Sequence, residues 1–183
     1  DIIAFNRGDG IDTLVSSTGA DNTLSLGGGI DYQSLALSKS GNNLILDTGN
    51  ADQIILQNWY SDAANHSIAN LQLVLDASAC DASSTDPLLN RQVQSFDFAA
   101  LAQAFDQALA GNPTLTAWNL TDTLLSAHLA GSDTAALGGD LAYQYGRSGT
   151  LAGMGVNAAQ EVLGDAQFGV LAQQLRPLAG LQE

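Results

Sequence analysis

The sequence predicts an α+β protein in which turns of a parallel β-roll continue into an antiparallel meander and end in a small α-helical bundle. Glycine- and aspartate-rich turns recur over the first 31 residues, and apolar residues then alternate with polar ones to about residue 75. From about residue 96, Ala and Leu recur at helical spacing. The predicted domains are a β domain over residues 1–76, a linker over 77–94 and a helical domain over 95–183.

The first turn, residues 7–14, matches the nonapeptide Gly-Gly-x-Gly-x-Asp-x-apolar at every defined position except the first, which is Arg7. A Gly-x-Asp core returns at Gly19 to Asp21, and a third copy spans residues 27–31 with one residue inserted. Three copies favour calcium loops over ordinary Gly/Asp hairpin turns, which remain the alternative.

The residue types in these turns suit a hard cation. Calcium takes about six to eight oxygen ligands, which glycine-permitted turns supply as backbone carbonyls and short Asp side chains complete. The predicted metal-binding residues are Arg7, Gly8, Asp9, Gly10, Asp12, Gly19, Asp21, Leu26, Gly27, Gly29 and Asp31.

Two nonapeptides make one coil of such a solenoid, so turns on one edge are two repeats apart. Asp12 and Asp31 therefore share an edge, a complete site bridges the first and third turns, and Asp21 lies on the opposite edge. The apolar position after each Asp, which begins a strand pointing into a core, holds Leu14 in the first copy only. The later copies are degenerate, and we expect few ions.

Residues 1–31 resemble the last β-roll turns of RTX (haemolysin-type calcium-binding) proteins. Residues 34–60 are similar to the related domain that often follows such repeats, and the remainder is similar, more weakly, to the C-terminal regions of large RTX proteins. The resemblance implies Ca²⁺ as the ligand, an extracellular location at the cell surface or in the medium, and the type I secretion machinery as a partner.

Composition limits the partners. Five Lys and Arg against nineteen Asp and Glu give a net charge of −14, which argues against nucleic acid and against anionic membranes. No apolar run is long enough to span a membrane.

Cys80 is the single cysteine, which excludes an intramolecular disulfide and a cysteine-based zinc cluster. Calcium is therefore the candidate that stabilises the fold in their place. The chain opens on Asp1, and we expect it to be a piece of something longer.

Four strands follow the third turn, and the first three should form the meander. Their paired apolar positions are Leu35 and Leu37, Leu44 and Leu46, Ile54 and Leu56, and Leu71, Leu73 and Leu75. The turn from Gly49 to Asp52 echoes the calcium loop, and we predict a turn rather than a site. Trp59 and Tyr60 should cap the sheet; a sugar-binding platform is the weaker alternative.

The linker contains Asp86-Pro87, which we interpret as a turn opener in preference to a self-processing bond. Four helices follow. They are predicted over 98–111, with Ser95 or Asp97 as N-cap, over 119–131, over 132–146, and from Asn157 to about residue 176 with a break at Gly164.

Catalysis is not expected. His66 and His128 stand alone in sequence, no nucleophile or phosphate-loop motif occurs, and Glu161 and Glu183 do not suit a glycosidase pair. The predicted function is a non-catalytic calcium-binding structural module of a secreted or surface RTX protein, of adhesin or fibre type. We expect calcium outside the cell to switch its β half from disordered to folded, and the folded chain to self-associate as a homo-oligomer or filament through an open strand edge. The alternative is a C-terminal secretion and folding appendage of an extracellular enzyme or toxin.

Overall fold

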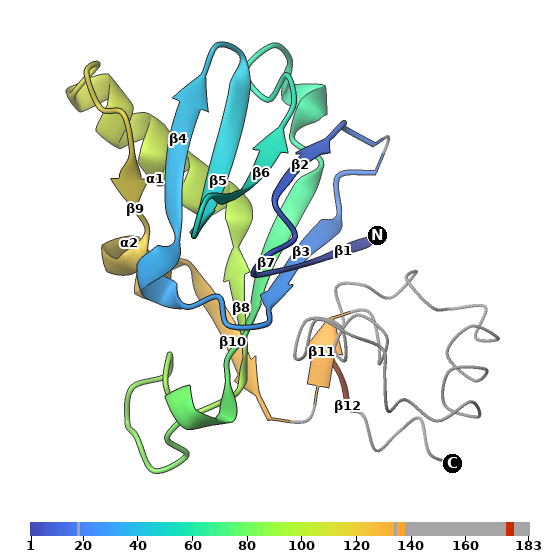
Figure 1. Ribbon diagram of the computed structural model, residues 1–183, viewed down its shortest axis with the longest axis vertical. Coiled ribbons are helices and arrows are strands. Elements are labelled where there is room, and N and C mark those ends of the chain that lie inside the picture. Colours follow the sequence, from blue (N-terminus) through green and yellow to red (C-terminus); the bar gives the residue numbers. More distant parts are fainter. Residues whose placement is uncertain (18, 134, 138–174, 178–183) are drawn as a thin grey trace, which may run out of the picture.

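The computed structural model describes residues 1–17, 19–133, 135–137 and 175–177, which form two mixed five-stranded sheets, a separate two-stranded pair and two α-helices (Figure 1). The first sheet has the order β1 (Ile2–Asn6), β3 (Asn22–Gly27), β7 (Ile68–Val74), β8 (Val93–Asp97) and β10 (His128–Ser132). The second has the order β2 (Ile11–Leu14), β6 (Asp52–Leu56), β5 (Asn43–Gly49), β4 (Ala36–Ser40) and β9 (Trp118–Asn119). Strands β11 (Ala135–Leu137) and β12 (Leu175–Pro177) pair with each other.

The three strands of the meander follow from alternation. Along β5 and β6 every second residue is buried, and β4–β5 and β5–β6 both pair antiparallel, as predicted. The β5–β6 turn needs left-handed backbone, with φ of 86° at Gly49, 56° at Asn50 and 67° at Ala51. Glycine and asparagine tolerate that region, which explains the Gly-Asn spelling of the turn.

The predicted parallel β-roll is wrong. Parallel pairing is confined to β1–β3–β7 in the first sheet and β2–β6 in the second, and each sheet then continues antiparallel. A roll needs an apolar residue after every turn to build successive coils, and Thr23 and Gln33 stand at those places. The alternating segments after residue 35 instead pair through tight hairpins, which produces mixed sheets.

Helix α1 (Phe98–Gly111) begins and ends as predicted. The Asp97 side chain caps it by accepting the Ala100 N–H at 3.0 Å, and its apolar face buries four residues: Phe98, Leu101, Ala102 and Phe105. Short 3₁₀ turns occur at Tyr32–Ser34 (η1), Ala63–Asn65 (η2) and Ala77–Ala79 (η3).

The predicted helical bundle is also wrong. The second helix, α2, covers only Thr121–Ala127, because residues 128–132 pair with the edge of β8 as β10. Ala and Leu favour helix intrinsically, but an available sheet edge offers backbone hydrogen bonds that override this weak preference. In the third predicted helix, residues 135–137 form β11 and residue 132 ends β10, and the end of the fourth lies in β12. The rest of the third from residue 138 and the fourth up to residue 174 lie outside the described residues, as do Gly138, Gly139, Glu161 and Glu183.

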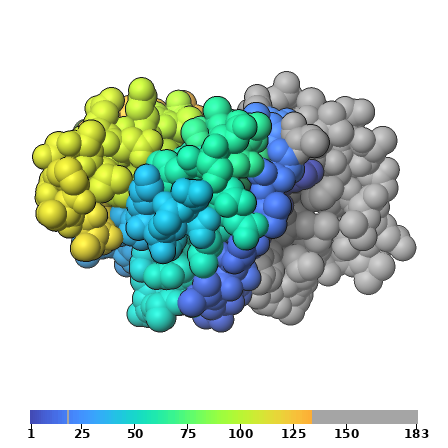
Figure 2. Space-filling view, turned by 90° about the horizontal axis from the view of Figure 1, so that it is seen from above, coloured from blue at the N-terminus to red at the C-terminus, as the bar shows by residue number. Residues whose placement is uncertain are grey.

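One apolar core joins the sheets and helices. Helix α1 contacts β7 and α2, the Phe98 ring meets Trp59 edge-on at 5.7 Å, and Trp59 itself is 2% exposed. Phe105 reaches Trp118 of the second sheet at 6.2 Å between ring centroids. Figure 2 shows the helical residues and the N-terminal strands on opposite sides of the central strands. Within the described part of the chain, no helix has the length and apolarity needed to cross a membrane.

This shared core predicts that Phe98→Ala destabilises the sheets as well as the helix. We expect a loss of about 3–5 kcal/mol in the free energy of unfolding, because the truncation leaves a cavity between α1 and Trp59. Leu125→Ala, at a side chain that is 57% exposed, is the matched control and should stay within about 0.5 kcal/mol of wild type. Urea unfolding followed by tryptophan fluorescence and by far-ultraviolet circular dichroism checks this. Two separate transitions would contradict a shared core.

Candidate functional site

The register of β1 against β3 brings the first and third glycine turns together. Asn6 stands opposite Gly27 in this parallel pair, so both strands end at the same level. The turns that follow, residues 7–10 and 28–31, therefore lie side by side, and the β5–β6 turn over residues 49–52 joins them. We call these three turns the loop edge. Its glycines Gly8, Gly10, Gly28 and Gly29 have φ of 92°, 87°, 57° and 91°, which explains why glycine is required there.

The first turn is closed by its own aspartate. The Asn6 N–H donates to Asp9 Oδ2 at 2.8 Å, and the Asp9 N–H donates to the Asn6 carbonyl at 3.1 Å. Such side-chain to backbone bonds are the usual reason for Asp in tight turns. Asp9, predicted as a metal ligand, serves the turn in this structure.

Asp52 clamps the first turn to the second sheet. Its carboxylate, on a residue that is 5% exposed, accepts the Gly8 N–H at 2.7 Å and the Gly10 N–H at 3.1 Å. The Gln53 N–H returns a bond to the Gly10 carbonyl at 2.8 Å. Backbone N–H groups that converge from glycine turns form an anion-binding nest, and the protein fills this one with its own carboxylate.

Arg7 ties the first turn to the third. Its Nε and Nη2 both donate to the Gly29 carbonyl, at 2.9 and 2.7 Å. The side chain also passes close to Gly49, where an added Cβ would lie 3.5 Å from Nη1. The guanidinium thus sits where all three turns of the loop edge meet.

The residue before Arg7, Asn6, has a side-chain amide without hydrogen-bond partners. Asn6 is 2% exposed, and neither its Oδ1 nor its Nδ2 has a hydrogen-bond partner. The amide packs against Gly28, where any side chain would overlap it. Leaving a buried polar group unpaired costs about 1–3 kcal/mol, so an unpaired amide at a turn junction calls for an explanation.

The two aspartates predicted to bridge the turns occupy different kinds of position in the structure. Asp12 is exposed and stands in β2 opposite Ile54, on the strand face that Leu14 also uses. Asp31 is the N-cap of η1, where it accepts the Ser34 N–H at 2.9 Å in a capping box. Both residues are solvent-exposed: Asp31 is the last residue of the third turn, and Asp12 follows the first turn. We call the positions of these two carboxylates the rim of the loop edge.

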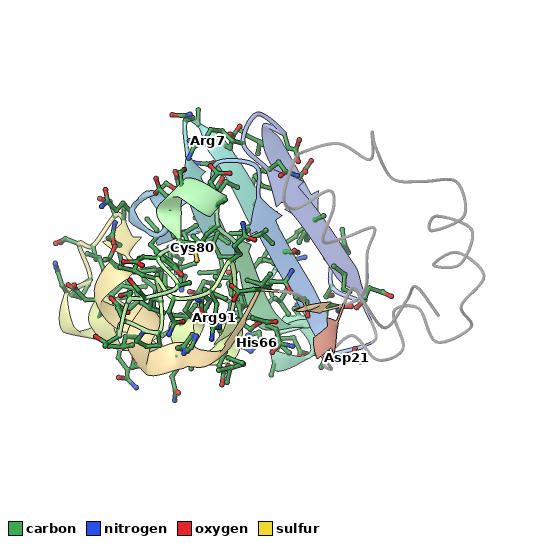
Figure 3. The ribbon with its side chains drawn as sticks, turned by 90° about the horizontal axis from the view of Figure 1, so that it is seen from below. Arg7, Asp21, His66, Cys80 and Arg91 are labelled. Atoms are coloured by element: carbon green, nitrogen blue, oxygen red, sulfur yellow. The ribbon has the colours of Figure 1, made fainter. Side chains whose placement is uncertain are left out.

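The remaining predicted ligands divide between the two ends of β3. Gly27 ends β3, and its carbonyl accepts the Ile30 N–H at 3.3 Å, whereas Leu26 is fully buried in the core. Asp21 lies before the start of β3, and the Gly19 carbonyl accepts bonds from Ser17 and Asn22. Figure 3 shows Arg7 and Asp21 at opposite ends of the structure, which places the second turn away from the loop edge.

Sequence reasoning missed two residues of the loop edge. Asp52 was set aside because the turn before it lacks the second glycine of the calcium loop, and Asn6 precedes the nonapeptide. The Gly-x-x-Asp sequence from Gly49 to Asp52, which echoes the calcium loop, was a usable signal. No sequence signal indicates Asn6, whose importance depends on its burial.

The other reactive side chains are held in structural contacts. His66 stacks on Trp59 at 4.1 Å between ring centroids, and His128 Nε2 lies 2.7 Å from Gln94 Oε1, where burial lowers its pKa. No cluster of three or more His, Cys, Asp or Glu side chains that could hold a metal occurs among the described residues. Metal ligation at the loop edge would therefore need backbone and amide oxygens in addition to any carboxylates.

Tyr60 lines a surface hollow of about 700 Å³ between the β4–β5 turn and α1. Lys39 Nζ covers its ring at 4.0 Å, and its hydroxyl donates to Asp106 Oδ1 at 2.9 Å. Burial and this bond raise the pKa of Tyr60. Trp59, by contrast, is buried in the core, so the two rings do not form a joint aromatic platform.

Comparison of the chain with protein-family models and with curated proteins finds no match. The similarity to RTX proteins stays a prediction from the motifs.

The Asp52 clamp predicts a stability effect in chelator. Asp52→Asn keeps one acceptor oxygen but sets an NH₂ against the other N–H donor and removes the charge, and we expect a loss of about 1.5–3 kcal/mol in the free energy of unfolding. Asp12→Asn, at an exposed strand position, should change it by about 0.5 kcal/mol or less. Urea titrations in EDTA measure both. Equal midpoints for the two variants would show that the clamp contributes nothing.

Proposed function

We propose that this chain is a non-catalytic structural module of a secreted or cell-surface protein, and that calcium binds at its loop edge. The observation that carries the proposal is the pairing of β1 with β3, which sets two glycine turns side by side. Their left-handed glycines supply the turn geometry, and Asp12 and Asp31 supply carboxylates at the rim.

The donor chemistry of the loop edge fits calcium only in part. Backbone carbonyls, the unpaired Asn6 amide and the two rim carboxylates are the hard oxygen ligands that this ion takes. Against this, the Gly29 carbonyl is already bonded to Arg7, and the Asp52 carboxylate to two amides. We therefore expect weak binding, at the rim.

Weak binding still suits an extracellular module. With a dissociation constant of about 0.1 mM, calcium at about 1 mM stabilises the folded state by roughly 1.4 kcal/mol for one site. The net charge of −14 adds repulsion that a bound cation relieves. At cytosolic calcium this contribution vanishes, so the chain is less stable before export than outside.

Calcium should raise the melting temperature of the wild-type chain over that in EDTA, because the folded state gains a ligand. The double variant Asp12→Ala/Asp31→Ala removes both rim carboxylates and should lose that calcium-dependent increase. A matched double control, Asp62→Ala/Asp122→Ala, removes the same charge at exposed residues of η2 and α2 and should keep it. Thermal melts by circular dichroism decide the matter. Identical melts of the wild type in calcium and EDTA would end the proposal.

Self-association through the N-terminal strands is the second part of the proposed function. Among the described strands, β1 and β2 are outer strands of their sheets and lie on the same side of the molecule (Figure 1). Ile11 in β2 and Val15 just after it are 63% and 72% exposed. An outer strand with apolar side chains is a template for pairing with another chain.

This interface predicts oligomers in calcium that Ile11→Lys/Val15→Lys converts to monomer, because buried lysines oppose strand pairing. Leu89→Lys/Leu125→Lys, at side chains that are 38% and 57% exposed and lie outside the strands, is the control and should leave the oligomers intact. Light scattering coupled to gel filtration measures the mass. A wild-type monomer at high concentration would remove the support for a fibre.

A further inference from the structure

Arg7 stands at the one defined position where the first turn departs from the calcium-loop nonapeptide, a position that the nonapeptide reserves for glycine. Its side chain crosses from the first turn to the third and donates twice to the Gly29 carbonyl, at 2.9 and 2.7 Å. Figure 3 shows it at the end of the strands, where the turns gather. A cation therefore lies against a carbonyl oxygen of a glycine turn, which is the kind of contact a bound calcium would make.

The surroundings of this cation are those of an ion site and not of a surface ion pair. The ion pair between Arg91 and Asp133, at 3.3 Å, joins two exposed side chains. Arg7 instead donates to a neutral backbone oxygen, and its side chain also passes close to Gly49 of the β5–β6 turn. The guanidinium thus joins the backbone of the first turn to that of the third.

Asn6 is an independent sign that this position was built for a ligand. Its buried amide has an unpaired oxygen and nitrogen, and it packs against Gly28, the residue before the carbonyl that Arg7 binds. Amide oxygens are ordinary calcium ligands. Arg7 satisfies the Gly29 carbonyl and leaves the Asn6 amide unpaired, as expected if one cation has replaced another with different coordination.

We propose that the inner position of the loop edge is a divalent-cation site in which the Arg7 guanidinium takes the place of the metal. Arg7 keeps the first and third turns together without calcium and, by occupying the Gly29 carbonyl, keeps metal out of the inner position. The inference deepens the proposed function, on which it rests for the presence of rim ligands. It stands separately in its claim that Arg7 stabilises the calcium-free fold.

The test is substitution of Arg7 with Gly, which restores the nonapeptide, and with Gln, which removes the charge at similar length. In EDTA both variants should melt below wild type. Calcium titration by calorimetry should show at least about tenfold tighter binding, because a carbonyl and an amide join the ligands and a positive charge leaves. Arg7→Lys, which keeps the charge, should bind no tighter than wild type. Arg91→Ala removes a cation elsewhere and should match wild type in both measurements.

The outcomes separate the two proposals. If Arg7→Gln binds calcium no tighter than the wild type, or melts at the wild-type temperature in EDTA, the inference is overturned whatever the wild type binds. If the wild type binds no calcium and Arg7→Gly does, the proposed function fails and the inference stands. Should Arg7→Gly fold only in calcium, the inference is supported. If Arg7→Gly fails to fold in both buffers, the Arg7→Gln measurements decide the matter.

Discussion

The parallel pairing of β1 with β3 is the constraint on which the loop edge depends. It joins residues about twenty positions apart and fixes Asn6 opposite Gly27, and both turns then emerge at one level. A slip of one residue would exchange the two faces of β1 and move Phe5, which is 1% exposed, out of the core. Burial of Phe5 thus sets the register that brings Arg7 to the Gly29 carbonyl.

Two charged side chains, Asp52 and Arg7, supply the hydrogen-bond partners of the backbone at the loop edge. Glycine turns leave both N–H and C=O groups without partners in regular structure, and each kind needs a partner of its own. Asp52 gathers the N–H groups of the first turn, and Arg7 takes a C=O of the third. Because Asp52 lies in the second sheet, its two bonds also tie the first turn to that sheet, whereas the Arg7 bonds join the turns that follow β1 and β3 of the first sheet.

Much of the fold could be predicted from local pattern, and the parts that could not depend on contacts distant in sequence. Alternation located β4 to β7, and Asp97 followed by an apolar helical face located α1. Strand β10 was missed because its helix-favouring residues pair with β8, which lies more than thirty positions earlier. At the site, the Gly and Asp spelling identified the turns, but the partners of Arg7 and Asp52 appear only once residues 7, 29 and 52 are brought together.

The Asp52 clamp has a consequence for the order in which the chain folds. Gly8 and Gly10 find their acceptor 44 and 42 positions later, whereas β4, β5 and β6 join through short hairpins. Closing a long loop costs entropy before any contact repays it, so short-range hairpins form early and distant pairings late. We expect the meander to nucleate folding. The amino-terminal turns then remain open, with their carbonyls and carboxylates hydrated, until the rest of the molecule is in place to receive them.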